Sequence, residues 1–500
     1  MLALFASIFL PSHAWLANVN IDIPAHDQHP LTFASSCATA TERDHDVAGR
    51  PNTATRLELT SRTDATLFCA ADGDTFKSGY AHFANYLGVE DKHMFWWLFE
   101  AREEPESKPT VLLFGGGPGS SGLFFAFSGA GPCRLIAGED GEGAAIPSEY
   151  PWTDYVNVLA IDHPVGVGYS YGDAGSLRNS SDRAAWDVDD FLQAFWAEFP
   201  QLAKNQFMIQ SASYGGTYIP HIVNTILTRD IEAQKSSNTS RLLKMPESVI
   251  IGNGWSDPAT RYRYYLQIGC LDLKLFNQST CASFIPLVPV CLDALQLADE
   301  QPTLANKRAA LHACWRTLDF NLAVGKNPFD ARQECDDDDS CFPYFAWNNK
   351  VVGSDAVKEA AGIPEWLNYT FLAKDLIGTP FARNGDHIQA AYKLLGPAIE
   401  AGLRVLIYNG NMDAICPWRA NLAWMRIFQT KHQEQFRAAP RVPYPGVGWY
   451  QKAGAGGAGE YTFLSVDEAG HFVQWNQPRV FREFLVKWMR NEAFSDEDVQ

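Results

Sequence analysis

The sequence predicts an α/β fold in which helices flank a mostly parallel central sheet. Short apolar and β-branched runs end at glycine-rich or polar turns, with helical stretches between them, which is the pattern of strands buried on both faces. The 500 residues are 46% hydrophobic and 20% charged, a globular composition that excludes disordered, collagen-like and coiled-coil proteins. The formal net charge of -18 argues against nucleic acid or an anionic membrane as a partner, because both attract positive surfaces.

Five apolar runs are expected to form the buried parallel strands. Between the second and third, residues 184–199 place apolar side chains at helical spacing and are expected to pack on the sheet as a helix. The functional loops of such a sheet lie at the carboxyl ends of its strands. The expected strands are 111–114 before the turn 115–119, 156–161 before 162–164, 207–210 before 211–216, 249–251 before 252–254, and 404–408 before 409–410.

An apolar leader is expected at the N-terminus. Residues 1–14 are an apolar run followed by small residues, as in a secretory signal peptide; a truncated start or a buried first strand is the alternative, because no basic residue precedes the run. No later run has 18 uninterrupted apolar residues, and the last residues are polar and acidic, so no membrane anchor is expected. The core is expected in two parts, 15–261 and 379–500, separated by an inserted lid at 262–378.

The predicted lid is rich in cysteine. Six of the ten cysteines lie between Cys270 and Cys341, and their wide, irregular spacing does not match the tight pairs of a zinc site. The acidic run 336–339 lacks the spacing of a calcium loop and is expected to be solvated. No metal site and no cofactor are predicted. Sequence alone does not fix the disulfides, and sequence-near pairs are our prediction: Cys270–Cys281, Cys291–Cys314 and Cys335–Cys341.

Four N-x-[ST] sequons, together with the cysteines and the leader, predict a protein that enters the secretory pathway. Such a protein is secreted or resides in a secretory compartment, with the vacuole as a further destination. The expected glycosylation sites are Asn179, Asn238, Asn277 and Asn368.

Ser213 is the candidate nucleophile. It stands between a predicted strand and a predicted helix, with small residues on both sides that let the backbone turn sharply and lift the hydroxyl above the sheet. The usual pattern of this turn is G-x-S-x-G, and here Ser211 replaces the leading glycine. A serine beside two glycines is also common in ordinary turns, so the segment alone does not decide the function.

A serine nucleophile needs a base, and the base needs an acid that orients it. Asp413 follows the predicted strand that ends at Tyr408, and His471 follows a further predicted strand at 461–466. Nucleophile, acid and histidine therefore stand after strand ends in the order that this kind of fold uses. Each residue alone could be a turn or loop residue, but together they predict a catalytic triad.

An oxyanion hole needs two backbone N–H groups that point at the developing charge. One is expected from Tyr214, which follows the nucleophile. The other is expected from the glycine-rich loop 115–121, because glycine lets the backbone approach a substrate closely. A phosphate-binding loop is the weaker alternative, since no lysine follows these glycines.

These segments together resemble the serine carboxypeptidase family of α/β-hydrolases, especially its secreted fungal branch, over roughly residues 69–484. The resemblance implies that Ser213 is the nucleophile, His471 the base and Asp413 the acid that orients it. It also implies that the N–H groups of Gly117 and Tyr214 form the oxyanion hole, and that Cys416 is an unpaired cysteine near the binding pocket. The matching blocks, in the family's order, are 116–121, 131–133, 162–170, 213–216, 413–416 and 469–471.

The chain departs from the family where the substrate carboxylate is recognised. The resemblance implies that an asparagine and two carboxylic acids hold the C-terminal carboxylate of a peptide, and the matching positions are Gly115, Ala212 and, by an ungapped count, Gly129. All three side chains are absent, although a desolvated carboxylate needs donors or positive charge. The residues expected to line the substrate pocket are Gly115, Gly116, Gly129, Ala212, Cys416 and Phe472.

Three functions are compatible with the sequence. The first is a secreted serine carboxypeptidase-like hydrolase that releases C-terminal residues from peptides with altered carboxylate recognition. The second is a related esterase or acyltransferase that acts on a small-molecule ester or amide, and the third is a catalytically silent binding protein of the same fold. The triad counts against the third, so the expected partner is a peptide or small-molecule acyl substrate. The substrate's identity and the oligomeric state are left open.

Overall fold

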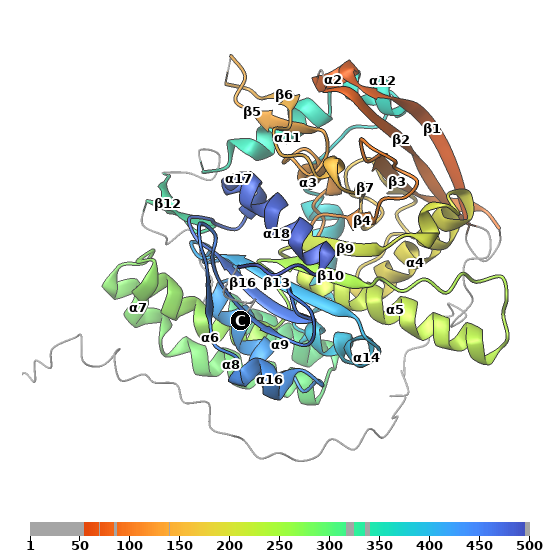
Figure 1. The fold of residues 1–500 in the computed structure, drawn as a ribbon. Helices are drawn as coiled ribbons and strands as arrows, with labels where there is room; N and C mark the ends of the chain where they lie inside the picture. The colour runs from red at the N-terminus through yellow and green to blue at the C-terminus, as the bar shows by residue number, and fades with distance from the viewer. Residues whose placement is uncertain are drawn as a thin grey trace, which may run out of the picture. The chain divides into compact units, whose positions relative to one another are not determined.

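The computed structural model describes residues 55–69, 71–84, 88–139, 141–316, 325–335 and 341–495. The leader predicted at 1–14, Cys37 and the acidic run 336–339 lie outside these residues. The described chain forms one compact unit around a mixed sheet of twelve strands in the order β1-β2-β3-β7-β4-β9-β10-β13-β16-β15-β14, with β8 paired to β3 (Figure 1). The strands are β1 (Arg56–Ala65), β2 (Ala71–Ala84), β3 (Glu90–Phe99), β4 (Thr110–Leu113), β7 (Asn157–Ile161), β8 (Tyr171–Gly172), β9 (Phe207–Ala212), β10 (Ser248–Gly252), β13 (Arg404–Gly410), β14 (Val442–Tyr444), β15 (Gly448–Ala453) and β16 (Tyr461–Val466).

Six neighbouring strands at the centre of the sheet, β7, β4, β9, β10, β13 and β16, are parallel. Nearly every residue in them is buried. Both faces of these strands are covered, which explains why their sequences are continuous apolar runs and do not alternate. All five predicted strands are found here, and the α/β class is confirmed.

Helices cover both faces of the sheet. On one face, α4 (Ser181–Glu198) packs with its Phe195 ring centroid 6.0 Å from that of Trp96 on β3. On the other face, the ring centroid of Phe481 in α18 (Pro478–Arg490) lies 5.0 Å from that of Tyr408 in β13. The core therefore consists of two apolar layers separated by the sheet.

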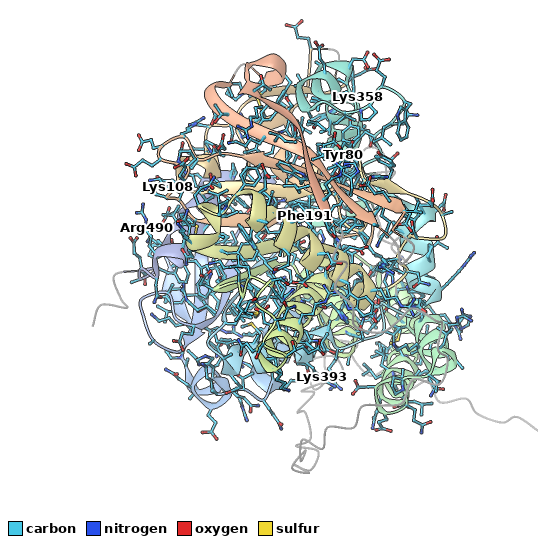
Figure 2. All side chains as sticks on the ribbon, turned by 90° about the vertical axis from the view of Figure 1, so that its right-hand side faces the viewer. Tyr80, Lys108, Phe191, Lys358, Lys393 and Arg490 are labelled. Carbon is cyan, nitrogen blue, oxygen red and sulfur yellow. A yellow bond between two sulfur atoms is a disulfide. The ribbon has the colours of Figure 1, made fainter. Side chains whose placement is uncertain are left out.

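The predicted helix at 184–199 coincides closely with α4. Figure 2 shows Phe191 of this helix inside the fold, whereas Lys108, Lys393 and Arg490 lie at its margin. The remaining helices of the core are α2 (Thr66–Cys69), α3 (Gly122–Ala126), α5 (Gly215–Lys235), α13 (Thr379–Arg383), α14 (Gly396–Glu400), α15 (Trp418–Ile427), α16 (Gln433–Ala438) and α17 (Val473–Asn476).

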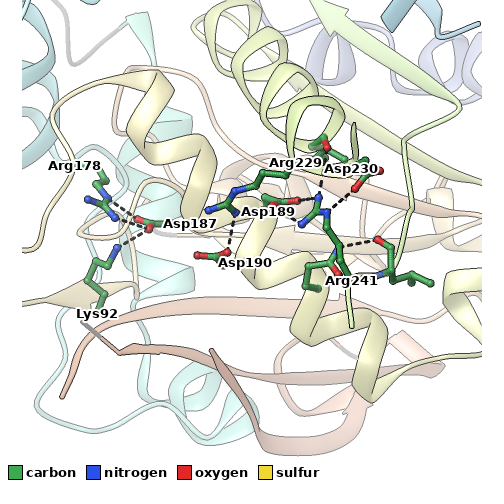
Figure 3. A network of polar contacts seen from close by, with 11 residues as sticks. Lys92, Arg178, Asp187, Asp189, Asp190, Arg229, Asp230 and Arg241 are labelled. Atoms are coloured by element: carbon green, nitrogen blue, oxygen red, sulfur yellow. Dashed lines mark hydrogen bonds and ion pairs between the residues drawn. The ribbon is translucent and has the colours of Figure 1, made fainter. Parts of the chain in front are cut away.

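A buried network of charges joins α4 to its neighbours (Figure 3). Arg229 of α5 contacts Asp189 and Asp190 of α4 at 2.6 and 2.8 Å. Arg241 adds a second contact to Asp189 and one to Asp230. Buried charges are stable only when paired, and these arginines each have two carboxylate partners.

The segment predicted as a lid, 262–378, lies between β10 and β13, which are neighbours in the sheet. It divides into two parts in the lower left and at the top of Figure 1. In the first, α7 (Gln278–Phe284), α8 (Leu287–Glu300) and α9 (Leu304–Trp315) pack with α6 (Pro258–Gln267) in small apolar clusters of their own.

The second part, α11 (Pro343–Val352) and α12 (Asp355–Ala361), joins the main core cluster and contacts β1, β2 and the small hairpin of β5 (Cys133–Ile136) and β6 (Ala144–Pro147). A two-stranded ribbon of β11 (Lys326–Asn327) and β12 (Asp330–Glu334) belongs to the same inserted segment. The boundaries at 261 and 378 stay a prediction.

All three predicted disulfides are confirmed: Cys270–Cys281, Cys291–Cys314 and Cys335–Cys341. A fourth, Cys69–Cys133, was not predicted and joins segments 64 residues apart within the main core. Cys416 is free and buried.

One segment, Gln278–Glu300, has the length and apolar composition that would allow it to cross a membrane. It comprises α7 and α8, which are separate helices, and a disulfide ties each of them to a neighbouring segment. These cross-links favour a helical pair packed beside α6 over a membrane span. The absence of a membrane anchor stays a prediction.

Candidate active site

Ser213 follows β9 directly and adopts a left-handed backbone conformation, with φ of 59°. Its N–H donates to the carbonyl of Gly252 at 2.9 Å, and its carbonyl accepts from Gly216 and Trp255 at 2.9 and 2.7 Å. A non-glycine residue rarely adopts positive φ, and such conformations gather at functional sites. The neighbouring loops therefore hold Ser213 in a tight strand-to-helix turn.

The residues around this turn explain its departure from the G-x-S-x-G pattern. The Ser211 hydroxyl donates to the carbonyl of Phe114 at 2.8 Å, so the leading serine is bonded to the neighbouring strand's end. A Cβ on Gly215 would lie 2.2 Å from the Ser211 hydroxyl oxygen. A serine fits at the leading position because the residue on the far side of the turn is glycine.

Asp413 and His471 lie together at the carboxyl ends of β13 and β16. The imidazole Nδ1 is 2.8 Å from the carboxylate Oδ2, and the two side chains are 1% and 0% exposed. Close backbone packing brings the two loops together, because a Cβ on Gly410 would lie 2.1 Å from the carbonyl oxygen of Gly470. The predicted contact between acid and base is thus present.

Asn253 connects the Asp413 carboxylate with the Ser213 turn. Its side-chain amide donates to Asp413 Oδ2 at 2.7 Å, and it directly follows Gly252, whose carbonyl accepts from Ser213. The backbone N–H groups of Ile415 and Cys416 complete the set of donors to this carboxylate. A carboxylate with this many donors is held in one orientation.

The glycine-rich loop lies against the Ser213 turn. A Cβ on Gly116 would lie 2.8 Å from the Cβ of Ser213 and 2.9 Å from the backbone nitrogen of Tyr214. Gly117 has φ of 102°, which requires glycine. Within the described ranges, the backbone N–H groups of Gly117 and Tyr214 donate no hydrogen bond to another protein group. Donors of an oxyanion hole are expected to be free in this way before a substrate binds.

A buried carboxylate anchors this loop. Asp162 accepts from the Ser121 hydroxyl and from the N–H groups of Gly122 and Tyr169. Burial nevertheless raises the pKa of Asp162 to about 6. Asp162 thereby ties the end of the glycine-rich loop to the loop that follows β7.

The side chain of Tyr214 is held in place at its phenol oxygen. Its phenol donates to Asp386 Oδ2 at 2.8 Å, and Ser181 donates to the same carboxylate through both its N–H and its hydroxyl. Burial raises the pKa of Asp386. His387, the next residue, packs 4.8 Å from the Tyr214 ring, and burial lowers its pKa to about 4, so this imidazole is neutral near neutral pH.

The described part of the chain contains no recorded hydrogen bond between the Ser213 hydroxyl and the outer ring nitrogen of His471. Catalytic hydrogen bonds are often long before substrate binds, so this does not separate the two groups chemically. The same described residues include no cluster of three or more His, Cys, Asp or Glu side chains arranged to hold a metal ion.

The three positions at which the carboxylate-recognition residues are absent are not equivalent in the structure. A Cβ on Gly115 would lie 2.1 Å from the carbonyl oxygen of Ser120, so the loop itself fills the place of a side chain there. Ala212 is buried at the end of β9, and its carbonyl lies against Gly116. Gly129 instead lines a cavity of about 40 Å³ with Ser148 and Gln474.

Phe472 belongs to an aromatic wall beside His471. Its ring centroid is 5.0 Å from that of His471 and 5.2 Å from that of Phe124. Phe329, between β11 and β12, packs 5.1 Å from His471 and accepts a hydrogen bond from its backbone N–H. The inserted segment, predicted as a lid over the site, therefore contributes Phe329 directly to it. The wall also includes Phe342, Phe345 and Phe371.

Cys416 is buried beside Asp413 and close to Arg261 of α6. Burial raises the pKa of this thiol to about 12, and the nearby guanidinium opposes that rise. A thiol with such a pKa is protonated and unreactive. The four predicted glycosylation sites, Asn179, Asn238, Asn277 and Asn368, are all exposed.

Asn253, Arg261, Phe329, Asp386 and His387 were not predicted as site residues. Asn253 stands between two glycines and has the sequence signature of a turn. Phe329 lies in the predicted lid, and the other three lie in the predicted core parts. Their functional position depends on contacts between distant segments, and the only sequence signal was that Asn253 follows a predicted strand.

Comparison with known proteins agrees with this geometry. The family model for serine carboxypeptidases matches residues 73–491. The chain is 32% identical over 425 residues to carboxypeptidase Y homolog A of Arthroderma otae, covering 83% of this chain and 75% of the relative. It is 31% identical over 426 residues to carboxypeptidase Y homolog A of Neurospora crassa, covering 82% and 72%.

Among solved structures, a prohormone-processing carboxypeptidase from Saccharomyces cerevisiae has the same fold. It superimposes with a TM-score of 0.70 at 18% identity, covering 86% of this chain and 96% of that one. The fold is therefore that of an α/β-hydrolase, and the chain is a serine-type, carboxypeptidase-like hydrolase. It belongs to the serine carboxypeptidase family.

Proposed function

We propose that this protein is a serine carboxypeptidase-like hydrolase that releases C-terminal residues from peptides through an acyl-enzyme, with altered recognition of the substrate carboxylate. The observation that carries the proposal is the buried Asp413–His471 pair, joined through Asn253 to the turn that holds Ser213 at positive φ. A structural role would not require a strained serine beside unpaired backbone donors.

In the proposed mechanism, His471 removes the proton from the Ser213 hydroxyl as its oxygen attacks the scissile carbonyl. Asp413 orients the imidazole and stabilises its charged form. The N–H groups of Gly117 and Tyr214 donate to the oxyanion. His471 then donates its proton to the leaving amine, and water hydrolyses the acyl-enzyme by the same steps with His471 again as the base.

The second candidate is an esterase or acyltransferase that acts on a neutral ester or amide. The absence of side chains at Gly115 and Ala212 favours it, because these positions offer no group to a substrate carboxylate. The two functions share the acyl-enzyme and differ in substrate. A panel of free peptides, C-terminally amidated peptides and esters distinguishes them by kcat/KM.

The proposal is tested by Ser213→Ala with a fluorophosphonate probe, which labels an activated serine covalently. We expect loss of labelling and a fall of roughly 10⁶-fold in kcat on an ester, with the melting temperature nearly unchanged. Ser211→Ala, two residues away in the same turn, is the matched control and should still be labelled. Labelling of Ser213→Ala equal to that of the wild type would rule out this nucleophile.

We also propose that the chain enters the secretory pathway and is secreted or delivered to a vacuole. Eight cysteines are paired in disulfides, which persist in oxidising compartments, and the four sequons are exposed. Endoglycosidase treatment of protein isolated from its native cells should lower its mass. An unchanged mass together with reduced cysteines would contradict this localisation.

A further inference from the structure

Arg261 is a buried guanidinium with unused donors. It lies on α6, is 2% exposed, and stacks over the Trp255 ring at 3.8 Å. Its Nε donates to the carbonyl of Ile415 at 2.7 Å, whereas Nη1 and Nη2 have no hydrogen-bond partner in the described structure. The edge of the guanidinium that forms paired hydrogen bonds with a carboxylate is therefore free.

Two half-buried arginines of this fold are paired with carboxylates. Arg229 contacts Asp189 and Asp190, and Arg241 contacts Asp189 and Asp230. Among the described residues, no ion pair involves Arg261. A buried, unpaired cation is unfavourable unless a ligand or water supplies its counter-group, so Arg261 needs such a group.

Arg261 lies between the two loops that hold the proposed catalytic residues. Ile415, which accepts from Arg261, donates its N–H to Asp413 at 2.8 Å. Trp255, whose ring lies under the guanidinium, donates its backbone N–H to the carbonyl of Ser213 at 2.7 Å. Arg261 thus contacts the Asp413 loop directly, through Ile415, and is linked to the Ser213 turn through Trp255.

The Cys416 thiol interacts with Arg261, but no carboxylate of the described residues pairs with the guanidinium. The Asp413 carboxylate already accepts from Asn253, His471 and two backbone N–H groups. His387 is nearby and its lowered pKa, caused first by burial and then by Arg261, keeps it neutral. The Arg261 guanidinium is therefore the positive charge at this position, and the edge that could form two parallel hydrogen bonds with a carboxylate has no acceptor.

We propose that Arg261 binds a carboxylate of the substrate and so replaces the missing recognition residues at positions 115 and 212. This inference rests on the proposed function, and it names the substrate class as acyl compounds that carry a carboxylate close to the scissile bond. The carboxylate belongs either to the C-terminus of a peptide or to an acidic side chain beside the bond. Both present the same planar pair of oxygens to the guanidinium.

Two matched substrate pairs distinguish the sources. The first pair is a blocked dipeptide with a free C-terminus and its C-terminal amide. The second is a blocked ester with Glu at the acyl position and its Gln counterpart. We expect wild-type kcat/KM to favour the carboxylate in one pair by about 10- to 100-fold, as for one charge-assisted pair of hydrogen bonds. Equal rates within both pairs would overturn the proposal without any variant.

Arg261→Gln should abolish the preference, measured as the ratio of kcat/KM for the carboxylate over its neutral partner within each pair, whatever the change in absolute rate. Arg261→Lys keeps the charge without the planar edge and should retain a small part of the preference. Arg263→Gln, which removes a partly exposed arginine from the same helix, is the matched control and should behave as the wild type. A carboxylate preference unchanged in Arg261→Gln would reject Arg261 as the receptor.

A binding measurement separates this inference from the proposed function. Calorimetry with the released free amino acid and with N-blocked glutamate, the products that carry the two candidate carboxylates, should show for one of them binding that Arg261→Gln weakens at least tenfold and Arg263→Gln does not. If the wild type shows no probe labelling but retains this difference, the hydrolase proposal fails and the carboxylate site stands. If labelling is present and the difference is absent, Arg261 holds water only and the inference fails.

Discussion

At the scale of single residues, two side chains on strained backbone define the site. Ser213 and Asn253 both have positive φ, at 59° and 43°, and each follows a buried central strand. Such strain is maintained only where the surrounding structure fixes the residue. In this protein the strained backbone places Ser213 at the carboxyl end of the central strand β9 and directs the Asn253 amide to the Asp413 carboxylate.

Asn253→Asp tests the role of that amide. The variant keeps the shape and the tolerance of positive φ but replaces the donor to Asp413 with a like charge. We expect kcat on a neutral ester to fall about 10- to 100-fold with little change in KM, because loss of a charge-assisted hydrogen bond misplaces the acid. If Asn253 serves packing alone, kcat will remain at the wild-type value.

Gly115→Ala tests whether the glycine-rich loop has room for a side chain. The added Cβ would lie 2.1 Å from the Ser120 carbonyl, so the loop must shift. We expect a loss of about 1–3 kcal/mol in the free energy of unfolding and a slower ester reaction, because Gly117 moves with the loop. Gly175→Ala, with no atom within 4 Å, is the control for adding a methyl group. An unaltered Gly115→Ala enzyme would show that the loop is adaptable.

At the scale of elements, the inserted segment has two separate roles. Phe329, between β11 and β12, packs on His471, while α7 to α9 form clusters of their own with α6. These helices contain the Cys291–Cys314 disulfide, whereas Cys69–Cys133 lies in the main core. Local unfolding of α8 and α9 should therefore leave the main core intact.

Removing the Cys291–Cys314 disulfide by double substitution to alanine should destabilise α8 and α9 by about 3 kcal/mol. We expect faster proteolysis between residues 285 and 316, with neutral-ester kcat within twofold of the wild type. The corresponding Cys69→Ala, Cys133→Ala variant should instead lower the main melting transition. If both variants lower that transition equally, the helices are not an independent part of the fold.

At the scale of the whole molecule, two sets of buried groups act on stability in opposite directions. Burial raises the pKa of Asp162 to about 6 and of Asp190 to about 7. The two carboxyl groups therefore contribute to the free energy of unfolding at acidic pH, and this contribution is lost as pH rises through these values. Burial lowers the pKa of His163 to about 3 and of His387 to about 4, so their contribution is present above the usual histidine pKa and is lost as pH falls.

Asp190→Asn removes one carboxyl whose ionisation is unfavourable. The melting temperature of the variant, relative to the wild type, should therefore increase by a few degrees as pH rises from about 4 to 7. A difference that is constant over this range would mean that Asp190 ionises normally in the fold.

The sequence predicted those features that local patterns determine. Continuous apolar runs identified the central strands, and the positions of Asp413 and His471 after strand ends predicted their contact. The burial of Arg261 was not predictable, because it depends on Trp255 and on a carbonyl of the loop after β13. The division of the inserted segment was also missed, since short helices give no signal of which cluster they join.

The strand order has a consequence for biosynthesis. Ser213 is synthesised well before His471, which follows β16, and β16 inserts between β13 and β15. At roughly 5–20 residues per second, the nucleophile exists for roughly 15–50 seconds before its base is synthesised. Under the proposed mechanism, a nascent chain that lacks β16 is inert toward the peptides around it. Hydrolysis would begin only when β16 has joined the sheet, so the topology itself delays the proposed activity.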